Sequence, residues 1–282
     1  MQAFKNFRDM DASFWAFIKY VSENLGYSIR SKGKVKDYSF NEIVELCEKY
    51  GINASKDIIL KAEQYSKMRA NLLNSFVRDM LMNAETASEE FRELEVLHRN
   101  NNYYCSLPLN KQKGDKRQVA FFTAIINIIT EKTIREITGN THSLGFDDDP
   151  HNLSYILDDN GKILGSSSRR FDGAYPSIKS PKLVWEIKEY YYATTFGSRI
   201  ADGVYETQLD GFEFKELYDR TGKKVYHVLF IDAYRTWWLQ GKSYLCRLVD
   251  ALNSGVVDEV IVGREVFSRW PELLHSVILE NN

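Results

Sequence analysis

The sequence predicts an α/β (α+β) protein, with a mixed central sheet of about four to five strands flanked by helices and an N-terminal helical region. Two observations lead to this class. The first hundred residues carry apolar side chains at helical spacing, whereas the later part alternates between strand-like and helical segments. The later order, α-β-β-β-α-β-α-β-α, describes a meander followed by a crossover, which gives a mixed sheet with helices on its faces.

The helical region is predicted over residues 1–117. Helices are expected from Phe14 to Gly26, from Ser39 to Gly51, from about Lys56 to Met82, and from Ser88 to His98. The second begins with Ser39-Phe-Asn-Glu42, which has the form of a capping box. Polar stretches at 99–102 and 110–117 mark the boundary to the next region.

The α/β domain is predicted over residues 118–282. Its expected elements are a helix at 118–138, strands at about 162–166, 170–175 and 183–191, a helix at 197–218, a strand at 225–231, a helix at 242–253, a strand at 259–262 and a final helix. Gly139-Asn140 ends the first of these helices, and Thr221-Gly222 forms a turn.

Composition places the chain among ordinary globular proteins, since 44% of its 282 residues are hydrophobic and 27% are charged. The longest apolar stretch, Val119 to Ile129, is too short to span a bilayer, and no secretory signal is visible. Three distant cysteines exclude a disulfide framework or a cysteine-based zinc site. We therefore expect a cytoplasmic protein with no membrane association.

Charge is unevenly distributed along the chain. Residues 1–118 hold 19 Lys and Arg against 16 Asp and Glu, whereas residues 119–282 hold 18 against 23. An acidic second half disfavours a purely electrostatic nucleic-acid binder. It suits a metal-using enzyme with carboxylates in one part and phosphate-binding cations in another, although two solvated surfaces of different charge would give the same numbers.

The segment 183–190 carries the residues most able to support catalysis. Side chains alternate along a strand, so Glu186 and Lys188 share one face. Asp172, in the preceding predicted strand, comes to lie beside Glu186 if the two strands pair. Two adjacent carboxylates repel unless a cation joins them, and oxygen ligands favour Mg²⁺, which also accepts substrate phosphate oxygens. Such an ion polarises a phosphodiester and activates water, and Lys188 would orient that water or stabilise developing charge.

These residues resemble the motif of the PD-(D/E)xK nuclease superfamily, which includes most type II restriction endonucleases. Asp172 matches the first acidic position, Glu186 the second and Lys188 the lysine, and the α-β-β-β-α-β order over about residues 118–265 also matches. The resemblance implies a restriction-endonuclease-like core with these three residues in catalysis. It also implies a Mg²⁺ ion held by Asp172, Glu186 and Ile187.

The motif departs from the family pattern at one position, where Phe171 replaces a proline that is frequently absent in the superfamily. Acid-x-Lys occurs again at Glu213 and Lys215, but in a predicted helix, where residues two apart point to different sides. The structural alternative for Glu186 and Lys188 is a polar strand face held by a salt bridge.

Many superfamily members carry a further carboxylate on the helix before the meander, and Glu131 and Glu136 are the candidates here. On a helical wheel, Glu136 falls among the apolar residues that should face the sheet, and Glu131 falls on the polar side. A charge among core residues needs a partner or a metal, so we expect Glu136 to join the catalytic group. Glu189 points away from Lys188 and is expected to be a surface charge.

Candidate DNA-binding cations lie in two places. Arg169 and Arg170 precede the strand of Asp172, and Arg199 begins the following helix; Lys113, Lys116 and Arg117 lie in the loop between the two regions. Each would contact a backbone phosphate, or would be an ordinary solvated or salt-bridged side chain.

We therefore expect a Mg²⁺-dependent endonuclease acting on double-stranded DNA, a type II restriction enzyme of a restriction-modification system. Residues 1–117 would serve DNA binding or dimerisation, and a homodimer would match a two-fold symmetric site. The alternatives are another nuclease of the same fold, for repair, phage defence or junction resolution, and a non-catalytic DNA-binding module. Five scattered histidines do not support a zinc site.

Overall fold

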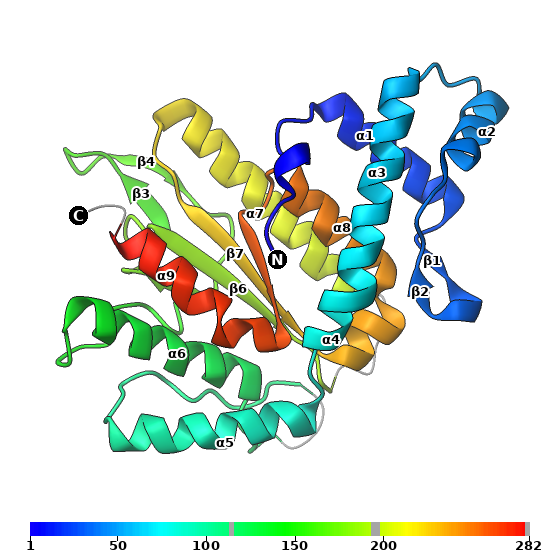
Figure 1. Cartoon of the computed structure of the whole chain (residues 1–282). Coiled ribbons are helices and arrows are strands. Elements are labelled where there is room, and N and C mark those ends of the chain that lie inside the picture. Colours follow the sequence, from blue (N-terminus) through cyan, green and yellow to red (C-terminus); the bar gives the residue numbers. More distant parts are fainter. Residues whose placement is uncertain (113–115, 193–197, 280–282) are drawn as a thin grey trace.

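The computed structural model describes residues 1–112, 116–192 and 198–279. Its centre is a sheet with the strand order β5-β6-β7-β8 (Figure 1). These strands are β5 (Gly173–Tyr175), β6 (Leu183–Glu189), β7 (Tyr226–Asp232) and β8 (Glu259–Val262). β5 runs antiparallel to β6, whereas β6, β7 and β8 run parallel. The predicted mixed sheet is therefore present.

Helices cover both faces of this sheet (Figure 1). They are α5 (Ala84–Asn100), α6 (Phe121–Thr138), α7 (Ser198–Thr221), α8 (Lys242–Asn253) and α9 (Arg269–Leu279). α6 and α9 pack against the face that carries Trp185 and Phe230, and α5 packs in turn on α6. α7 and α8 pack against the opposite face, which carries Leu229 and Ile231. Because side chains alternate along a strand, Glu186 faces the α7 side.

The N-terminal region is helical, as predicted. It contains α1 (Ala12–Leu25), α2 (Phe40–Tyr50), α3 (Lys56–Leu72), the π-helical turn η3 (Leu73–Val77) and α4 (Arg78–Met80), with a hairpin of β1 (Ser28–Ile29) and β2 (Lys34–Val35). The capping box of Ser39 and Glu42 is confirmed at the start of α2. Arg69 of α3 is fully buried and pairs with Asp250 of α8 at 2.9 Å, which joins this region to the sheet domain. Short helical turns complete the chain at η1 (Lys5–Phe7), η2 (Arg30–Lys32), η4 (Tyr234–Gln240) and η5 (Gly263–Phe267).

Two predicted elements differ in the structure. The expected three-stranded meander is wrong, because β4 (Ile163–Ser166) pairs with β3 (Tyr155–Leu157) in a separate hairpin and does not join the central sheet. The helix expected up to Met82 ends at Met80, where Leu81 adopts an extended conformation. No helix within the described ranges is long and apolar enough to cross a membrane.

Candidate functional site

Strand pairing brings Asp172 next to Glu186. In the antiparallel register Gly173 lies opposite Trp185, and the carboxylate of the preceding Asp172 is close enough to raise the pKa of Glu186. The Asp172 amide donates to the carbonyl oxygen of Trp185 at 3.0 Å, and one carboxylate oxygen of Asp172 accepts from the amide of Ile187 at 2.6 Å. A Cβ at Gly173 would lie 2.0 Å from the Trp185 ring, so glycine at this position makes room for the indole across the strand pair.

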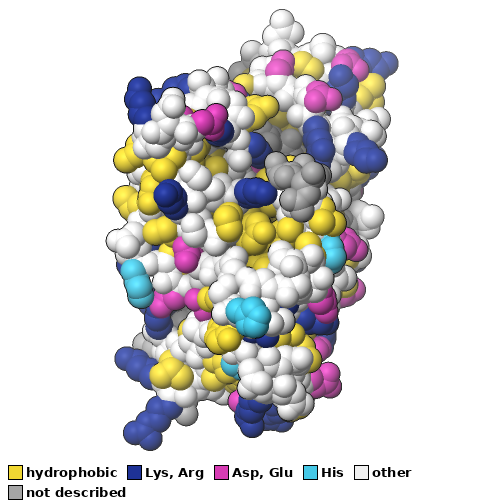
Figure 2. Space-filling model, turned by 90° about the vertical axis from the view of Figure 1, so that its left-hand side faces the viewer, with side chains coloured by type: hydrophobic (Ala, Val, Ile, Leu, Met, Phe, Trp, Pro, Cys, Tyr) yellow, Lys and Arg dark blue, Asp and Glu magenta, His cyan; other side chains and the backbone are white. Residues whose placement is uncertain are grey.

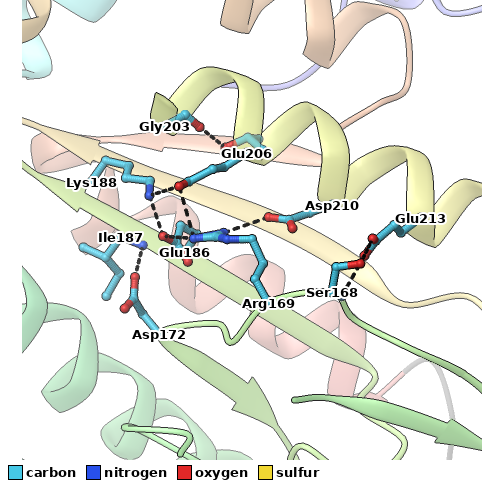
Figure 3. Close-up of polar contacts among 11 residues, drawn as sticks. Ser168, Arg169, Asp172, Glu186, Ile187, Lys188, Gly203, Glu206, Asp210 and Glu213 are labelled. Atoms are coloured by element: carbon cyan, nitrogen blue, oxygen red, sulfur yellow. Dashed lines mark hydrogen bonds and ion pairs between the residues drawn. The ribbon is translucent and has the colours of Figure 1, made fainter. Parts of the chain in front are cut away.

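Lys188 lies between two carboxylates (Figure 3). Its ammonium nitrogen is 2.6 Å from Oε1 of Glu186, on the same strand face as the sequence predicts, and 2.8 Å from Oε2 of Glu206 on α7. Burial lowers the pKa of Lys188, but attraction to Glu186 and hydrogen bonds to both carboxylates outweigh burial and raise it above its usual value. Lys188 is therefore a permanent cation and is not available as a general base near neutral pH.

Arg169 enters the same cluster from the loop that leads into β5 (Figure 3). Its guanidinium contacts Glu186 at 2.7 Å, Glu206 at 3.2 Å and Asp210 at 2.9 Å. Glu206 and Asp210 were not among the residues expected from the sequence. They lie one turn apart on α7, on the helix face turned toward β6, and Glu213 continues the row and accepts hydrogen bonds from Ser168.

The pKa values of three carboxyl groups in the site are raised, because the nearby cations do not fully offset burial and repulsion. The pKa of Glu186 rises to about 7, because burial and the neighbouring Asp172 outweigh the attraction of Lys188 and Arg169. Burial raises the pKa of Asp210 to about 6 against the attraction of Arg169. The pKa of Asp172 is also raised, mainly by the protein packed around it, although the side chain reaches solvent. An added cation would favour the ionised form of all three.

A polar cleft of about 710 Å³ opens over Asp172 and Glu186. Lys111 and Arg170 line it and are exposed, and Lys111 is close enough to help lower the pKa of Asp172. The remaining lining comes from residues 149–153 and 168–171. The cleft therefore combines a carboxylate pair with cations from two separate segments.

None of the other expected DNA-binding cations that the structure describes lines the cleft. Arg199 is exposed near the start of α7, where its carbonyl oxygen accepts a hydrogen bond from Tyr190, and Lys116 and Arg117 are exposed in the loop before α6. Lys113 lies outside the described residues. Charged and apolar side chains are interspersed over the face in Figure 2, so that face has no field of a single sign.

The expected burial of Glu136 is wrong. Its side chain is 56% exposed on α6 and lies 3.8 Å from Lys132, so it does not join the site. Glu131 is the buried carboxylate, with no exposed surface, and it accepts hydrogen bonds from the amides of Tyr104 and Cys105. α6 lies between the sheet and α5, so the side of the helix that seemed polar is also covered by protein.

The expected exposure of Glu189 is also wrong. The carboxylate is buried at the start of α6, where the amide and hydroxyl of Thr123 each donate to it at 3.0 Å. Burial raises its pKa to about 7, although these hydrogen bonds and the helix amides favour the ionised form. Glu189 therefore caps a helix and does not contribute to the cleft.

The residues at the cleft fit a hard divalent cation. In the described ranges no three His, Cys, Asp or Glu side chains form a metal-binding group, so side chains alone offer only the pair Asp172 and Glu186. A third oxygen is available from the main chain. The amide of Ile187 points toward Asp172, and the amide and carbonyl of one strand residue point to the same side. Mg²⁺ sites typically have only a few protein ligands and leave coordination positions for water and for substrate phosphate.

Two family models match the chain. One, described as Domain of unknown function (DUF7690), matches residues 1–76, and the other, described as Domain of unknown function (DUF7687), matches residues 82–277. No curated protein and no solved structure matches the chain. Because the second model covers more than half of the chain, the protein belongs to the family described as Domain of unknown function (DUF7687).

Proposed function

We propose that this protein is a divalent-metal-dependent nuclease with a restriction-endonuclease-like core that hydrolyses phosphodiester bonds of double-stranded DNA. The observation that carries the proposal is the position of Asp172 next to Glu186, beside a protonated Lys188 at a cleft. A strand face held only by a salt bridge would not need a second carboxylate beside the pair, and that carboxylate, Asp172, adds to burial in raising the pKa of Glu186.

Charge supports a divalent ion at this position. The ion-pair cluster and Asp172 contribute four carboxylates, and Arg169 and Lys188 contribute two cations, which leaves two negative charges when all four carboxyl groups are ionised. Lys111 and Arg170 add positive charge only at the rim of the cleft. Asp172, Glu186 and the carbonyl oxygen of Ile187 would hold Mg²⁺ there. When bound, the ion would supply Lewis acidity toward the phosphate and lower the pKa of a bound water.

The side chains have separate roles in this proposal. Lys188, held by Glu186 and Glu206, keeps a positive charge next to the metal ligands, where it would donate to the attacking water or to a phosphoryl oxygen. Lys111 and Arg170, at the rim of the cleft, would contact the phosphates that flank the cleaved bond. A carboxylate pair alone would repel the DNA backbone, so these cations are needed for binding.

The experiment compares cleavage and binding by matched variants. Asp172→Ala and Glu186→Ala should abolish Mg²⁺-dependent cleavage of plasmid DNA, while DNA binding measured in Ca²⁺ stays near wild type, because affinity comes mostly from phosphate contacts. Asp159→Ala is the control, since Asp159 is an exposed carboxylate in the turn between β3 and β4. Full turnover by either site variant, or wild-type cleavage that survives EDTA, would contradict the proposal.

Within the nuclease class we propose a sequence-specific type II restriction enzyme acting as a homodimer, since no nucleotide-binding motif for a DNA-translocating motor is present in the sequence. Digestion of a plasmid of known sequence followed by sequencing of the new termini tests this. Discrete fragments with a shared terminal sequence are expected. A smear, or cutting only at junctions or damaged sites, would instead indicate a repair, phage-defence or junction-resolving nuclease.

A further inference from the structure

Arg169 connects the candidate metal ligand Glu186 to a carboxylate that the proposed chemistry does not use. One guanidinium nitrogen donates to Oε1 of Glu186 at 2.7 Å, and the other donates to Oδ2 of Asp210 at 2.9 Å. Lys188 contacts the same Oε1 atom. Two cations therefore share one oxygen of Glu186, and a divalent ion bound between Asp172 and Glu186 would repel both of them.

The structure offers Arg169 a place to withdraw to. Asp210 has no exposed surface, and its second oxygen, Oδ1, is buried without a hydrogen-bond partner among the residues described. An unsatisfied buried carboxylate oxygen is costly, and a guanidinium satisfies both oxygens of a carboxylate through two parallel hydrogen bonds. Arg169 now makes only one of these two bonds with Asp210.

We propose that Asp210 is the second docking position of Arg169: when a divalent cation binds between Asp172 and Glu186, the guanidinium leaves Glu186 and forms a two-bond pair with Asp210. This inference rests on the proposed metal site. It makes Arg169 a positioning residue that neutralises Glu186 before the metal binds and releases it afterwards. Asp210 is a positioning residue as well, because the oxygen that lacks a partner in the metal-free arrangement gains one when Arg169 moves.

The chemistry of arginine explains why this residue suits the role. Its planar fork carries several fixed N–H donors, so it can bond to two carboxylates at once or to both oxygens of one. A lysine offers the same charge at a single point. A lysine at position 169 would therefore carry the charge but could not form the two-bond pair with Asp210. This difference between arginine and lysine provides a test.

The test measures Mg²⁺ binding by isothermal titration calorimetry without DNA, at pH 8.5, where Glu186, with a pKa of about 7, is ionised. Asp210→Asn should weaken binding roughly tenfold or more, the typical effect of losing a hydrogen bond between charged groups. The decisive measurement is the same substitution made in an Arg169→Gln background. There its effect should shrink to that of losing one charge, the size that Glu206→Gln shows, because no guanidinium remains to be relocated. Glu206→Gln removes an equal charge from the same cluster and should weaken binding similarly in both backgrounds.

Arg169→Lys provides a second measurement that does not depend on a change at the buried Asp210. It keeps the charge, so simple electrostatics predicts unchanged Mg²⁺ affinity, whereas the proposed exchange predicts binding several-fold weaker. Equal effects of Asp210→Asn in both backgrounds, or wild-type affinity of Arg169→Lys, would overturn the exchange and leave the nuclease proposal intact. Absence of Mg²⁺ and Mn²⁺ binding by the wild type, with no change on Glu186→Ala, would overturn both.

Discussion

A buried histidine makes the stability of this protein depend on pH in a way that one substitution should remove. His227, on β7, is 1% exposed and packs against the rings of Phe171 and Phe214, which also stack on each other. Neither of its ring nitrogens has a hydrogen-bond partner among the described residues. Burial, and then repulsion from Arg169 and Lys224, lowers its pKa to about 3, so the folded protein holds a neutral imidazole at pH 5.

The magnitude follows from proton linkage. An unfolded chain binds the His227 proton with a pKa of about 6.5, well above the folded value, so stability falls as the pH drops below about 6.5. At pH 5, proton binding to the unfolded chain raises the ratio of unfolded to folded protein by a factor of roughly 30. This lowers the free energy of unfolding by about 2 kcal/mol. His227→Leu keeps a similar volume and leaves no buried ring nitrogen unsatisfied, so it should be as stable as wild type at pH 8 or more stable.

Thermal melts of wild type and His227→Leu at pH 8 and pH 5 test this reasoning. Because other carboxyls also titrate, the relevant quantity is the difference in melting temperature between the two proteins at each pH. That difference should grow in favour of the variant by about 3–4 °C between pH 8 and pH 5. His275→Leu, at an exposed site on α9, should show no such growth. A difference that stays constant between the two pH values would refute the assignment of a neutral buried imidazole.

Three further predictions concern the site and its support. Gly173→Ala should lower the melting temperature strongly and impair Mg²⁺ binding measured by calorimetry, because the added methyl group would lie 2.0 Å from the Trp185 ring. Arg69→Met should destabilise the protein by about 3–5 kcal/mol in urea unfolding, since it leaves Asp250 buried without its cation. Lys188→Arg should reduce single-turnover cleavage by on the order of 10²–10³ with DNA affinity unchanged, because a planar fork cannot replace a compact ammonium; a rate near wild type would make Lys188 a structural counter-ion.

Sequence patterns predict the structure correctly where the residues of one short segment determine it. The capping box at Ser39 identified the start of α2, since both of its hydrogen bonds lie within four residues. Alternation along β6 correctly separated Trp185, which packs under α6 and α9, from Glu186 and Lys188, which face α7. Pairing of β5 with β6 then brought Asp172 to Glu186, as the sequence suggested.

Strand pairing and helix burial depend on partners that a local pattern does not specify. The segment 163–166 has the pattern of a strand, but nothing in it indicates whether it pairs with β5 or with β3. α6 shows the same problem in helical form, because the sheet covers one of its sides and α5 another. A helical wheel assumes one solvated side, so it assigned Glu131 to solvent and Glu136 to the core, the reverse of what the structure shows.

The site extends beyond the three-residue motif, because acidic residues of α7 also belong to it. Asp172, Glu186 and Lys188 lie within seventeen residues of one another, but the carboxylates that hold Lys188 and Arg169 follow about twenty residues later, on a helix that packs over the strand. Glu206, Asp210 and Glu213 recur at helical spacing, and that spacing is the signal that would have identified them. Because Glu186 shares its cations with Glu206 and Asp210, removing any one carboxylate changes how strongly the cations hold the others. The protonation of Glu186, with a pKa of about 7, is thus a property of the whole cluster, and substitutions on α7 should alter the pH dependence of metal binding although no residue of α7 belongs to the motif.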